Sequence, residues 1–253
     1  MIESDHDLST KIKILVNKSK YLFNTLYKHL LLNRCHLCNK HSDSHTALCK
    51  NCLEDIQASQ PKCAKCSITV RVHESICNDC KNTQPHFDQI FAPCSYEFPI
   101  SKLCHDFKFL AKKYIAESMS IAIIENRKLS NADYPDLLCA IPMHPKKHEE
   151  HQFDQANELA TRLSHKTGIR YRNNLLVKTK ETKQQKRSNK AARLKNIKNS
   201  FSVRNIEFVK GKSIAIVDDV VTTGATVDEA SRMLKQAGAK RIEIWAFART
   251  PKQ

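Results

Sequence analysis

Eight of the eleven cysteines form four Cys-x-x-Cys pairs, a spacing that places two thiolates on one side of a tight turn. The second half of this segment repeats the first at an offset of 28 residues, so each half has the pattern C-x2-C-x10-C-x2-C. Two such pairs supply the four sulfur ligands of a tetrahedral structural Zn²⁺, and the duplication therefore predicts two zinc sites per chain. The predicted ligands are Cys35, Cys38, Cys49, Cys52, Cys63, Cys66, Cys77 and Cys80.

The grouping of these ligands around each metal is not fixed by their spacing. The repeat favours sequential grouping, in which each half closes its own site, and an interleaved grouping stays open. Disulfides are disfavoured in the reducing compartment expected for this chain, and a redox pair normally occurs once, beside a strand. Cys94, Cys104 and Cys139 are isolated in segments typical of helices or strands, so we expect them to be dispensable for metal binding.

A second group of polar residues lies between an apolar run at 213–217 and a helical pattern at 228–237. Two acids come first, and their carboxylates suit a vicinal diol or a hydrated Mg²⁺. Hydroxyl groups and the N–H groups of a helix start follow, and these can bind a phosphate. The order predicts a ribose 5-phosphate site, against the alternative of an ordinary strand-to-helix turn with threonine caps. The candidate residues are Asp218, Asp219, Thr222, Thr223, Gly224, Ala225 and Thr226.

The segment 178–198 concentrates positive charge, because nine lysines and arginines stand against one acid, Glu181, for a formal net charge of +8. Its large apolar residues are only Leu194 and Ile197, so we expect a solvated loop or arm. One interpretation is that this arm neutralises phosphates of single-stranded DNA. The other is a mobile hood over the ribose phosphate pocket. The residues assigned to DNA binding are Lys183, Lys186, Arg187, Lys190 and Arg193.

Strand-like and helix-like segments alternate along the rest of the chain, which predicts an α/β fold with a parallel sheet. Ligands of such sheets bind at the carboxyl ends of the strands. Three parts are expected: an N-terminal amphipathic helix in 1–32, the cysteine module in 33–84, and the α/β domain in 85–253. The expected strands are 89–98, 136–141, 213–217 and 241–248, and the expected helices follow Pro99 and cover 155–166, capped by Gly168, and 228–237.

The overall composition limits the class of protein and its partners. Lysine and arginine number 42 against 26 acids, a formal net charge of +16, which favours polyanionic partners. The sequence has no signal peptide and no run of 18 uncharged apolar residues, so we expect a cytoplasmic protein without a membrane span. The pattern at 11–32 is expected to pack on the following domain, with binding to the inner face of the membrane as the alternative.

The order strand, Asp-Asp, Thr-Thr-Gly-Ala-Thr, helix resembles the phosphoribosyl-diphosphate motif of type I phosphoribosyltransferases. Joined to a cysteine-rich N-terminal module, it is similar to the ComF family of DNA uptake and competence, with its GntX-type members. By this resemblance Asp218 and Asp219 hold the ribose hydroxyls, and residues 222–226 bind the 5-phosphate. The similarity extends from 35 to about 249. Further matching positions are 141–147, 153–156, Lys178, Lys180, Thr182, Gln185, Arg193, Asn196, Phe201 and Arg249.

The resemblance implies a double zinc ribbon followed by a type I phosphoribosyltransferase-like domain over 85–253. It also implies three partners: phosphoribosyl diphosphate bound with Mg²⁺, single-stranded DNA, and other DNA-uptake proteins. Lys146 and Lys147 would contact the pyrophosphate. The sequence at 149–154 lacks two arginines and a glycine that the family often has there, and each arginine fork can bind two phosphate oxygens. Phosphate binding is thus better supported than turnover, and an active transferase with an unidentified acceptor is the alternative.

Overall fold

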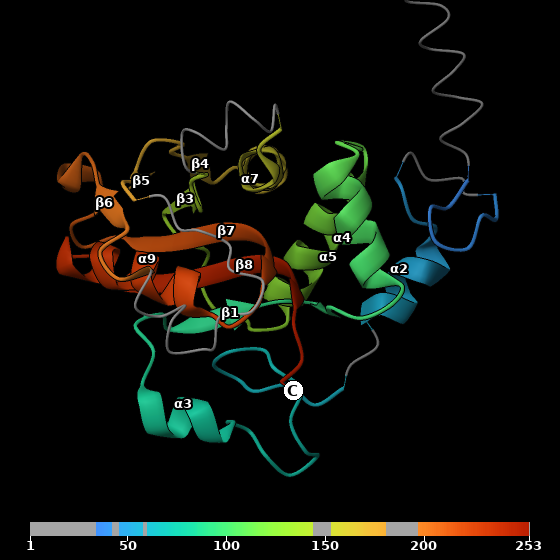
Figure 1. Ribbon diagram of the computed structural model, residues 1–253, viewed down its shortest axis with the longest axis horizontal. Helices are drawn as coiled ribbons and strands as arrows, with labels where there is room; N and C mark the ends of the chain where they lie inside the picture. The colour runs from blue at the N-terminus through green and yellow to red at the C-terminus, as the bar shows by residue number, and fades with distance from the viewer. Residues whose placement is uncertain (1–33, 42–45, 58–59, 144–152, 181–196, 253) are drawn as a thin grey trace, which may run out of the picture. The chain divides into compact units, whose positions relative to one another are not determined.

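The computed structural model describes residues 34–41, 46–57, 60–143, 153–180 and 197–252 (Figure 1). The predicted N-terminal helix, Lys146, Lys147 and the five basic residues assigned to DNA binding lie outside these described residues. The chain divides into two compact units, residues 1–52 and 53–253. The boundary between the units falls between the two halves of the 28-residue repeat. The first cysteine cluster therefore belongs to one unit and the second cluster to the other.

A parallel sheet forms the centre of the second unit, in the order β1-β8-β7-β3-β4 with β2 also paired to β8 (Figure 1). All of these pairs are parallel, which confirms the predicted α/β class. The strands are β1 (Gln89–Phe91), β2 (Cys94–Ser95), β3 (Leu137–Ala140), β4 (Arg170–Tyr171), β7 (Ser213–Val221) and β8 (Arg241–Arg249).

The two central strands are continuous apolar runs because both faces of the sheet are covered. Residues 214–217 of β7 and 244–248 of β8 are fully buried. Helices α5 (Ile115–Lys128) and α7 (Gln155–Thr167) pack on each other and on the sheet, whereas α9 (Ala225–Gln236) packs on β7 and β8. Right-handed connections place α5 and α7 on one face of the sheet and α9 on the other.

The remaining elements are short or lie at the edges of the sheet. Helix α4 (Ile100–Phe109) precedes α5, so the residues after Pro99 form two helices. Strands β5 (Leu176–Lys178) and β6 (Phe201–Val203) form a separate antiparallel ribbon from which the basic segment leaves and returns. The other elements are α2 (Lys50–Gln57), α3 (Asn78–Thr83) and η1 (Ile206–Phe208). No helix in the described part of the chain is long and apolar enough to span a membrane.

The predicted element boundaries need three corrections. The strand expected at 89–98 is two strands, because Pro93 has no N–H to donate to the neighbouring β8. The strand expected at 213–217 continues to Val221, so both acids of the motif belong to it. The helix expected at 228 begins at Ala225, directly after Gly224 in the left-handed conformation. The helix at 155–167 has its predicted cap, since Gly168 has φ 74°.

One ion pair lies inside the sheet domain. Arg127 of α5 donates from Nε and Nη2 to the carboxylate of Glu243 in β8, at 2.8 and 3.0 Å, and each side chain is 1% exposed. Trp245 donates to the same carboxylate at 2.8 Å, and the guanidinium stacks on Phe91 with 4.8 Å between centres. Every strong donor and acceptor of the pair is therefore engaged within the core.

Replacing Arg127 with Met should destabilise the domain strongly. The change leaves the buried Glu243 carboxylate with only the partly exposed Arg241, 2.9 Å away, as a cation, and breaking a buried pair from one side costs about 3–5 kcal/mol. Urea denaturation followed by far-UV circular dichroism measures this loss. Lys128→Met removes an exposed lysine paired with Glu125 and should change stability by less than about 0.5 kcal/mol. Equal effects of the two variants would contradict a structural role for the buried pair.

Candidate functional site

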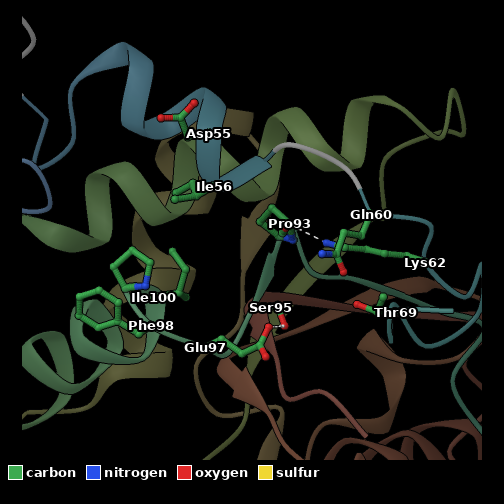
Figure 2. A pocket seen from close by; sticks show the side chains of 11 residues that line it. Asp55, Ile56, Gln60, Lys62, Thr69, Pro93, Ser95, Glu97, Phe98 and Ile100 are labelled. Atoms are coloured by element: carbon green, nitrogen blue, oxygen red, sulfur yellow. Dashed lines mark hydrogen bonds between the residues drawn. The ribbon is translucent and has the colours of Figure 1, made fainter.

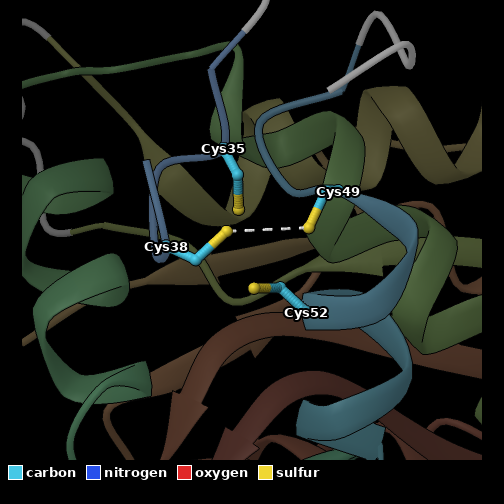
Figure 3. Close-up of side chains that lie close together, drawn as sticks. All are labelled: Cys35, Cys38, Cys49 and Cys52. Atoms are coloured by element: carbon cyan, nitrogen blue, oxygen red, sulfur yellow. Dashed lines mark hydrogen bonds between the residues drawn. The ribbon is translucent and has the colours of Figure 1, made fainter. Parts of the chain in front are cut away.

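The first cysteine cluster brings together two Cys-x-x-Cys pairs in the unit 1–52 (Figure 3). The four sulfur atoms all lie within 4.8 Å of one another, and the Sγ atoms of Cys38 and Cys49 are 3.8 Å apart. Tetrahedral ligands at about 2.3 Å from a Zn²⁺ lie about 3.8 Å from each other, so the spacing fits this metal. The cluster members are Cys35, Cys38, Cys49 and Cys52.

The second cluster has the same form but a different environment. Its sulfur atoms also lie within 4.8 Å of one another, with 3.6 Å between Cys66 and Cys77. Cys63, Cys66 and Cys80 are buried and belong to the apolar core that contains the β7 and β8 side chains. Sequential grouping is thus the observed one, and the second cluster is part of the sheet domain's interior. The cluster members are Cys63, Cys66, Cys77 and Cys80.

Backbone groups prepare one thiol in each cluster for a metal. Burial raises the pKa of Cys35, but N–H groups of neighbouring residues outweigh it and bring the pKa down to about 6. The same balance of burial against N–H donors, among them Cys77 N–H at 3.3 Å, lowers the pKa of Cys63 to about 7. Thiolates are the form that binds Zn²⁺. The donor set and geometry of both clusters therefore support two structural zinc sites.

The three isolated cysteines have the opposite environment. Cys94, Cys104 and Cys139 are buried in the sheet domain and lie outside both clusters. Burial raises the pKa of both Cys94 and Cys139 to about 12, so these thiols stay protonated at neutral pH. They behave as small apolar side chains of the core.

The predicted acidic pair lies at the carboxyl end of β7, beside the end of β3. Ala140 of β3 is opposite Val217, and Ile141 N–H donates to Val217 O at 2.9 Å. Residues 141–143, which precede Lys146 and Lys147 in the sequence, therefore leave the sheet next to Asp218. This is the edge at which ligands of parallel α/β sheets bind.

The two carboxylates stand close to each other, and within the described part of the chain neither forms a salt bridge with a lysine or arginine. Asp218 accepts from the N–H of Asp219, and Asp219 accepts from the N–H of Val220, at 2.9 and 2.8 Å. Burial raises the pKa of Asp218 well above its usual range, and the Asp219 charge raises it further. Lys108 of α4 opposes this rise through its positive charge. Such a pair is prepared to accept hydrogen bonds from hydroxyls or to meet a divalent cation.

The turn between β7 and α9 exposes neutral donors. Thr222 and Thr223 are exposed, and Gly224 has φ 84°, a conformation that favours glycine. Thr223 Oγ1 accepts from Ala225 N–H at 3.3 Å. The first helical hydrogen bond of α9 runs from Asp228 N–H to Gly224 O, so the N–H groups of the preceding first turn have no partner within the helix. The turn thus brings the predicted hydroxyl and backbone donors to one helix start.

Arg249, the last residue of β8, connects this turn to the second cysteine cluster. Its buried guanidinium donates from Nε to Cys66 O at 3.1 Å and from Nη1 to Val221 O at 2.9 Å and to Thr222 O. Thr250 N–H donates to the same Val221 carbonyl at 3.0 Å. The sequence marked Arg249 as a matching position but gave no sign of this bridge, because its three acceptors come from distant segments.

Charge as well as geometry holds this guanidinium in place. Burial lowers the pKa of Arg249, whereas the charges of Cys66, Cys77 and Cys80 raise it. A Zn²⁺ with four thiolates carries a net charge of −2, so the second cluster is the counter-ion of Arg249. Through Arg249 the second cysteine cluster is therefore linked to the backbone of the turn after β7.

Other residues near the acidic pair were not found from the sequence. Gln155, at the start of α7, donates from Nε2 to Lys108 O at 3.1 Å and ties α4 to α7. Tyr96 lies close enough to Asp219 for that charge to raise its pKa, after the larger effect of burial. The Phe153-Asp154-Gln155-Ala156 motif could have pointed to Gln155, but nothing in the sequence signals Lys108 or Tyr96.

The ends of the basic segment are fixed beside α9. Thr179 N–H donates to Ser200 O at 2.8 Å where the β5–β6 ribbon ends. Asn199 N–H donates to Glu229 Oε1 at 2.7 Å, and Arg232 donates to Asn199 Oδ1 at 2.8 Å. Since α9 begins at the donor turn, the segment is tethered to the helix of the candidate site.

Two family models match this chain. One, described as "Double zinc ribbon domain", matches residues 26–81, and the other, "Phosphoribosyl transferase domain", matches residues 154–253. The first contains both cysteine clusters, and the second contains the acidic pair and the donor turn. Together with the observed parallel sheet, these matches establish a phosphoribosyltransferase-type α/β fold that follows the zinc-ribbon cysteine clusters in the sequence.

Curated relatives align with this chain along most of their own length. Competence protein F of Haemophilus influenzae is 29% identical over 80% of this chain and 90% of its own. The chain is thus similar to competence proteins of the ComF type. DNA utilization protein YhgH of Escherichia coli K12 is 27% identical over 81% of this chain and 92% of its own. Competence protein ComFC of Streptococcus pneumoniae is 25% identical over 59% of this chain and 61% of its own.

Solved structures match this chain over about half its length. A purine phosphoribosyltransferase from Pyrococcus horikoshii has a TM-score of 0.33 and 19% identity, over 54% of this chain and 82% of its own. A structure described as the allosteric regulatory enzyme of purine biosynthesis has a TM-score of 0.38 and 18% identity. The chain spans 30% of the length of that enzyme.

Two serine variants should separate the two zinc sites of this protein. The unaltered chain should contain two zinc ions, and Cys38→Ser and Cys66→Ser should each contain one. Only Cys66→Ser should lower the melting temperature of the sheet domain, by several degrees or more, because the second cluster shares its core. Metal analysis measures the zinc, and the fluorescence of Trp245, the single tryptophan, reports unfolding of the sheet. Loss of both ions from Cys38→Ser would contradict two separate sites.

Proposed function

We propose that this chain acts in DNA uptake, and that its α/β domain binds phosphoribosyl diphosphate with Mg²⁺ and also binds single-stranded DNA. The names of its relatives, competence protein F and DNA utilization protein, support the role in DNA uptake. The phosphoribosyl transferase model supports the sugar phosphate ligand. The observation that carries the ligand proposal is the acidic pair followed directly by the donor turn at one end of β7.

The donor turn suits the 5-phosphate of the ligand. The N–H groups in the first turn of α9 lie at the positive end of the helix dipole, where an anion is stabilised. Thr222, Thr223 and Thr226 add hydroxyl donors without adding charge. Because Gly224 takes a left-handed conformation, the backbone can turn tightly beneath the phosphate. Phosphate specificity would therefore come from many neutral donors.

The acidic pair suits the ribose hydroxyls and the metal. Carboxylate oxygens are hard ligands that Mg²⁺ prefers, and they accept hydrogen bonds from a vicinal diol. Mg²⁺, when bound with the ligand, supplies positive charge against the diphosphate. In this proposal Asp218 and Asp219 hold the sugar in position. Burial raises the pKa of Asp218 and the charge of Asp219 raises it further, and a bound Mg²⁺ would oppose both effects.

The pyrophosphate end of the site determines whether the protein also catalyses transfer. Lys146 and Lys147 are the proposed contacts, and the adjacent segment lacks the arginines that are frequent in the family. The match to the transferase model favours, as a second candidate function, an active phosphoribosyltransferase that acts on a base or another small acceptor. Its test is release of pyrophosphate from phosphoribosyl diphosphate, with and without candidate acceptors.

The basic segment is the proposed contact with single-stranded DNA. Its lysines and arginines would neutralise backbone phosphates, and the absence of aromatic residues from 178 to 200 favours binding with little sequence preference. Its ends are tethered to the β5–β6 ribbon and to α9. The same tether also supports the alternative of a hood that closes over the phosphoribosyl ligand. Other DNA-uptake proteins, and a cytoplasmic location near the inner face of the membrane, belong to the same proposal.

Asp218→Asn should weaken binding of phosphoribosyl diphosphate with Mg²⁺ while stabilising the fold. Loss of one charged hydrogen bond costs about 1.5–3 kcal/mol of binding, which isothermal titration calorimetry measures. In the folded protein the pKa of Asp218 is raised, so native stability falls as pH rises from the usual aspartate pKa through the raised one. Asparagine removes that penalty. The melting temperature should therefore increase by a few degrees at neutral pH, where about 1 kcal/mol corresponds to roughly 2–4 °C.

The stabilising effect of Asp218→Asn should vanish at a pH below the usual aspartate pKa, where the carboxyl is protonated in both states. Glu207→Gln removes an exposed acid elsewhere and should change neither binding nor stability. Unaltered affinity in the Asp218→Asn variant would assign the acidic pair a purely structural role.

Replacing Lys183, Lys186, Arg187 and Lys190 with Gln should reduce the salt dependence of DNA binding. Each phosphate neutralised contributes about −0.7 to the slope of log affinity against log salt, so the slope should flatten by up to about 3. Fluorescence anisotropy with a labelled oligothymidine measures it. Lys210 and Lys240 precede β7 and β8 and so lie at the amino ends of these strands, away from the candidate site at the carboxyl ends. Their glutamine variants serve as controls. A hood would instead lose affinity for phosphoribosyl diphosphate and keep the salt slope.

A further inference from the structure

Helix α4 and the turn after it present aromatic and apolar side chains to solvent. The exposed fractions are 60% for Phe109, 56% for Leu110 and 36% for Tyr114. The ring of exposed His105 lies 4.8 Å from the ring of Phe109, at an angle of 42°. These planar groups therefore form a short row on the surface of the sheet domain.

The position of this row follows from the amphipathic pattern of α4. Its inner face consists of Leu103, Cys104 and Phe107, which are buried. On the opposite face Lys102, His105 and Phe109 follow one another at i, i+3 and i+7, so they share one side of the helix. The exposure of the His105 and Phe109 rings thus follows from the amphipathic pattern of α4, and neither ring contributes to the buried face of the helix.

Lysines accompany the exposed rings. Lys108 Nζ lies 5.7 Å from the centre of the exposed Phe109 ring. The exposed Lys113 is next to Tyr114 in the sequence, and its Nζ lies 5.7 Å from the centre of the buried Phe153 ring. Lys102 and Lys112 bond to the buried carboxylate of Asp106 at 3.2 and 3.1 Å, so the acid of this region points inward. The solvent side therefore combines planar rings with positive charge.

The amino-terminal end of α4 has a different character. Figure 2 shows Phe98 and Glu97 there, beside a cavity of 270 Å³ whose lining also includes Asp55. Lys62 lines the same cavity, but its ammonium group already donates to the carbonyls of Ala92 and Pro93. Two acids make this end unfavourable for a phosphate chain. The α4 surface is therefore defined as the stretch from Lys102 to Tyr114.

We infer that the α4 surface binds single-stranded nucleic acid by stacking unpaired bases on His105 and Phe109, with Lys108 and Lys113 beside the phosphates. This inference rests on the proposed function and adds a stacking site to the basic segment, which has no aromatic residues of its own. Single-strand sites combine a positively charged track with rings on which bases stack. The lysines select this occupant, because an apolar protein partner would not need them.

The surface lies next to the candidate site. Gln155 bonds the carbonyl of Lys108, and the Phe107 ring meets the Phe153 ring edge-on at 5.2 Å between centres. Residue 153 follows directly on the segment that contains Lys146 and Lys147. A strand on α4 would therefore pass beside the end of the sheet at which phosphoribosyl diphosphate is proposed to bind.

The test compares Phe109→Leu with Phe109→Trp in the full-length zinc protein, using a labelled oligothymidine and fluorescence anisotropy. Leucine keeps an apolar side chain but removes the ring, and it should weaken binding roughly five- to a hundredfold with an unchanged salt slope. Tryptophan keeps a stacking face and should bind at least as tightly as the unaltered chain. Lys113→Gln should flatten the salt slope by about 0.7.

The controls separate this surface from the proposed function. Tyr134→Leu removes a partly exposed ring that precedes β3 and should leave DNA binding unchanged. Zinc content, melting temperature and affinity for phosphoribosyl diphosphate should stay the same in Phe109→Leu, and a change in any of them would overturn the inference in favour of a structural role. DNA binding that both Phe109 variants leave unchanged, but that the basic-segment variant loses, would overturn only this surface. Absence of DNA binding by the unaltered chain would overturn both.

If the α4 surface instead binds a second copy of the chain, Phe109→Leu should change the oligomeric state measured by light scattering and leave the affinity for oligothymidine unchanged. That result would overturn the inference and assign the face to self-association.

Discussion

The buried guanidinium of Arg249 is the contact on which the candidate site depends. One cation, at the end of β8, binds the carbonyl of Cys66 in the second cluster and the carbonyls of Val221 and Thr222 in the turn after β7. A buried arginine is stable only with compensating charge and acceptors, and the charges of Cys66, Cys77 and Cys80 raise the pKa of Arg249 against the effect of burial. The second cysteine cluster is therefore connected to the backbone that carries the donors, because Arg249 bonds both the Cys66 carbonyl and the turn after β7.

Features encoded by neighbouring residues could be predicted from the sequence. The cysteine spacing fixes the sulfur clusters because each Cys-x-x-Cys turn is local, and the 28-residue repeat correctly favoured sequential grouping. The apolar run of β7, followed by acids, threonines and Gly224, indicated a strand, a turn and a helix start, which the structure contains. The boundaries were less accurate. The left-handed Gly224 lets α9 begin at Ala225, whereas the apolar periodicity is clear only further on.

Contacts between distant segments could not be predicted in the same way. Nothing in the residues near Arg127 indicates that Glu243 will meet it, because the pair forms only when α5 packs on β8. The second cysteine cluster gave no sign that its thiols join the core of the sheet, since its own segment is poor in large apolar residues. Lys108 is likewise one lysine among many until α4 brings it near Asp218. In each case a single sequence specifies the side chain but not the partner.

The distribution of charge separates two kinds of phosphate recognition on this domain. At the turn after β7 the donors are neutral and the adjacent groups are acids, so a bare polyanion is repelled there unless a cation accompanies it. On α4 the acid is buried and the lysines and rings face solvent, which suits a flexible strand with unpaired bases. A sugar diphosphate that binds with a divalent metal meets the first condition, and single-stranded DNA meets the second. The two proposed ligands can therefore occupy neighbouring surfaces without competing, because each requires a different form of charge compensation.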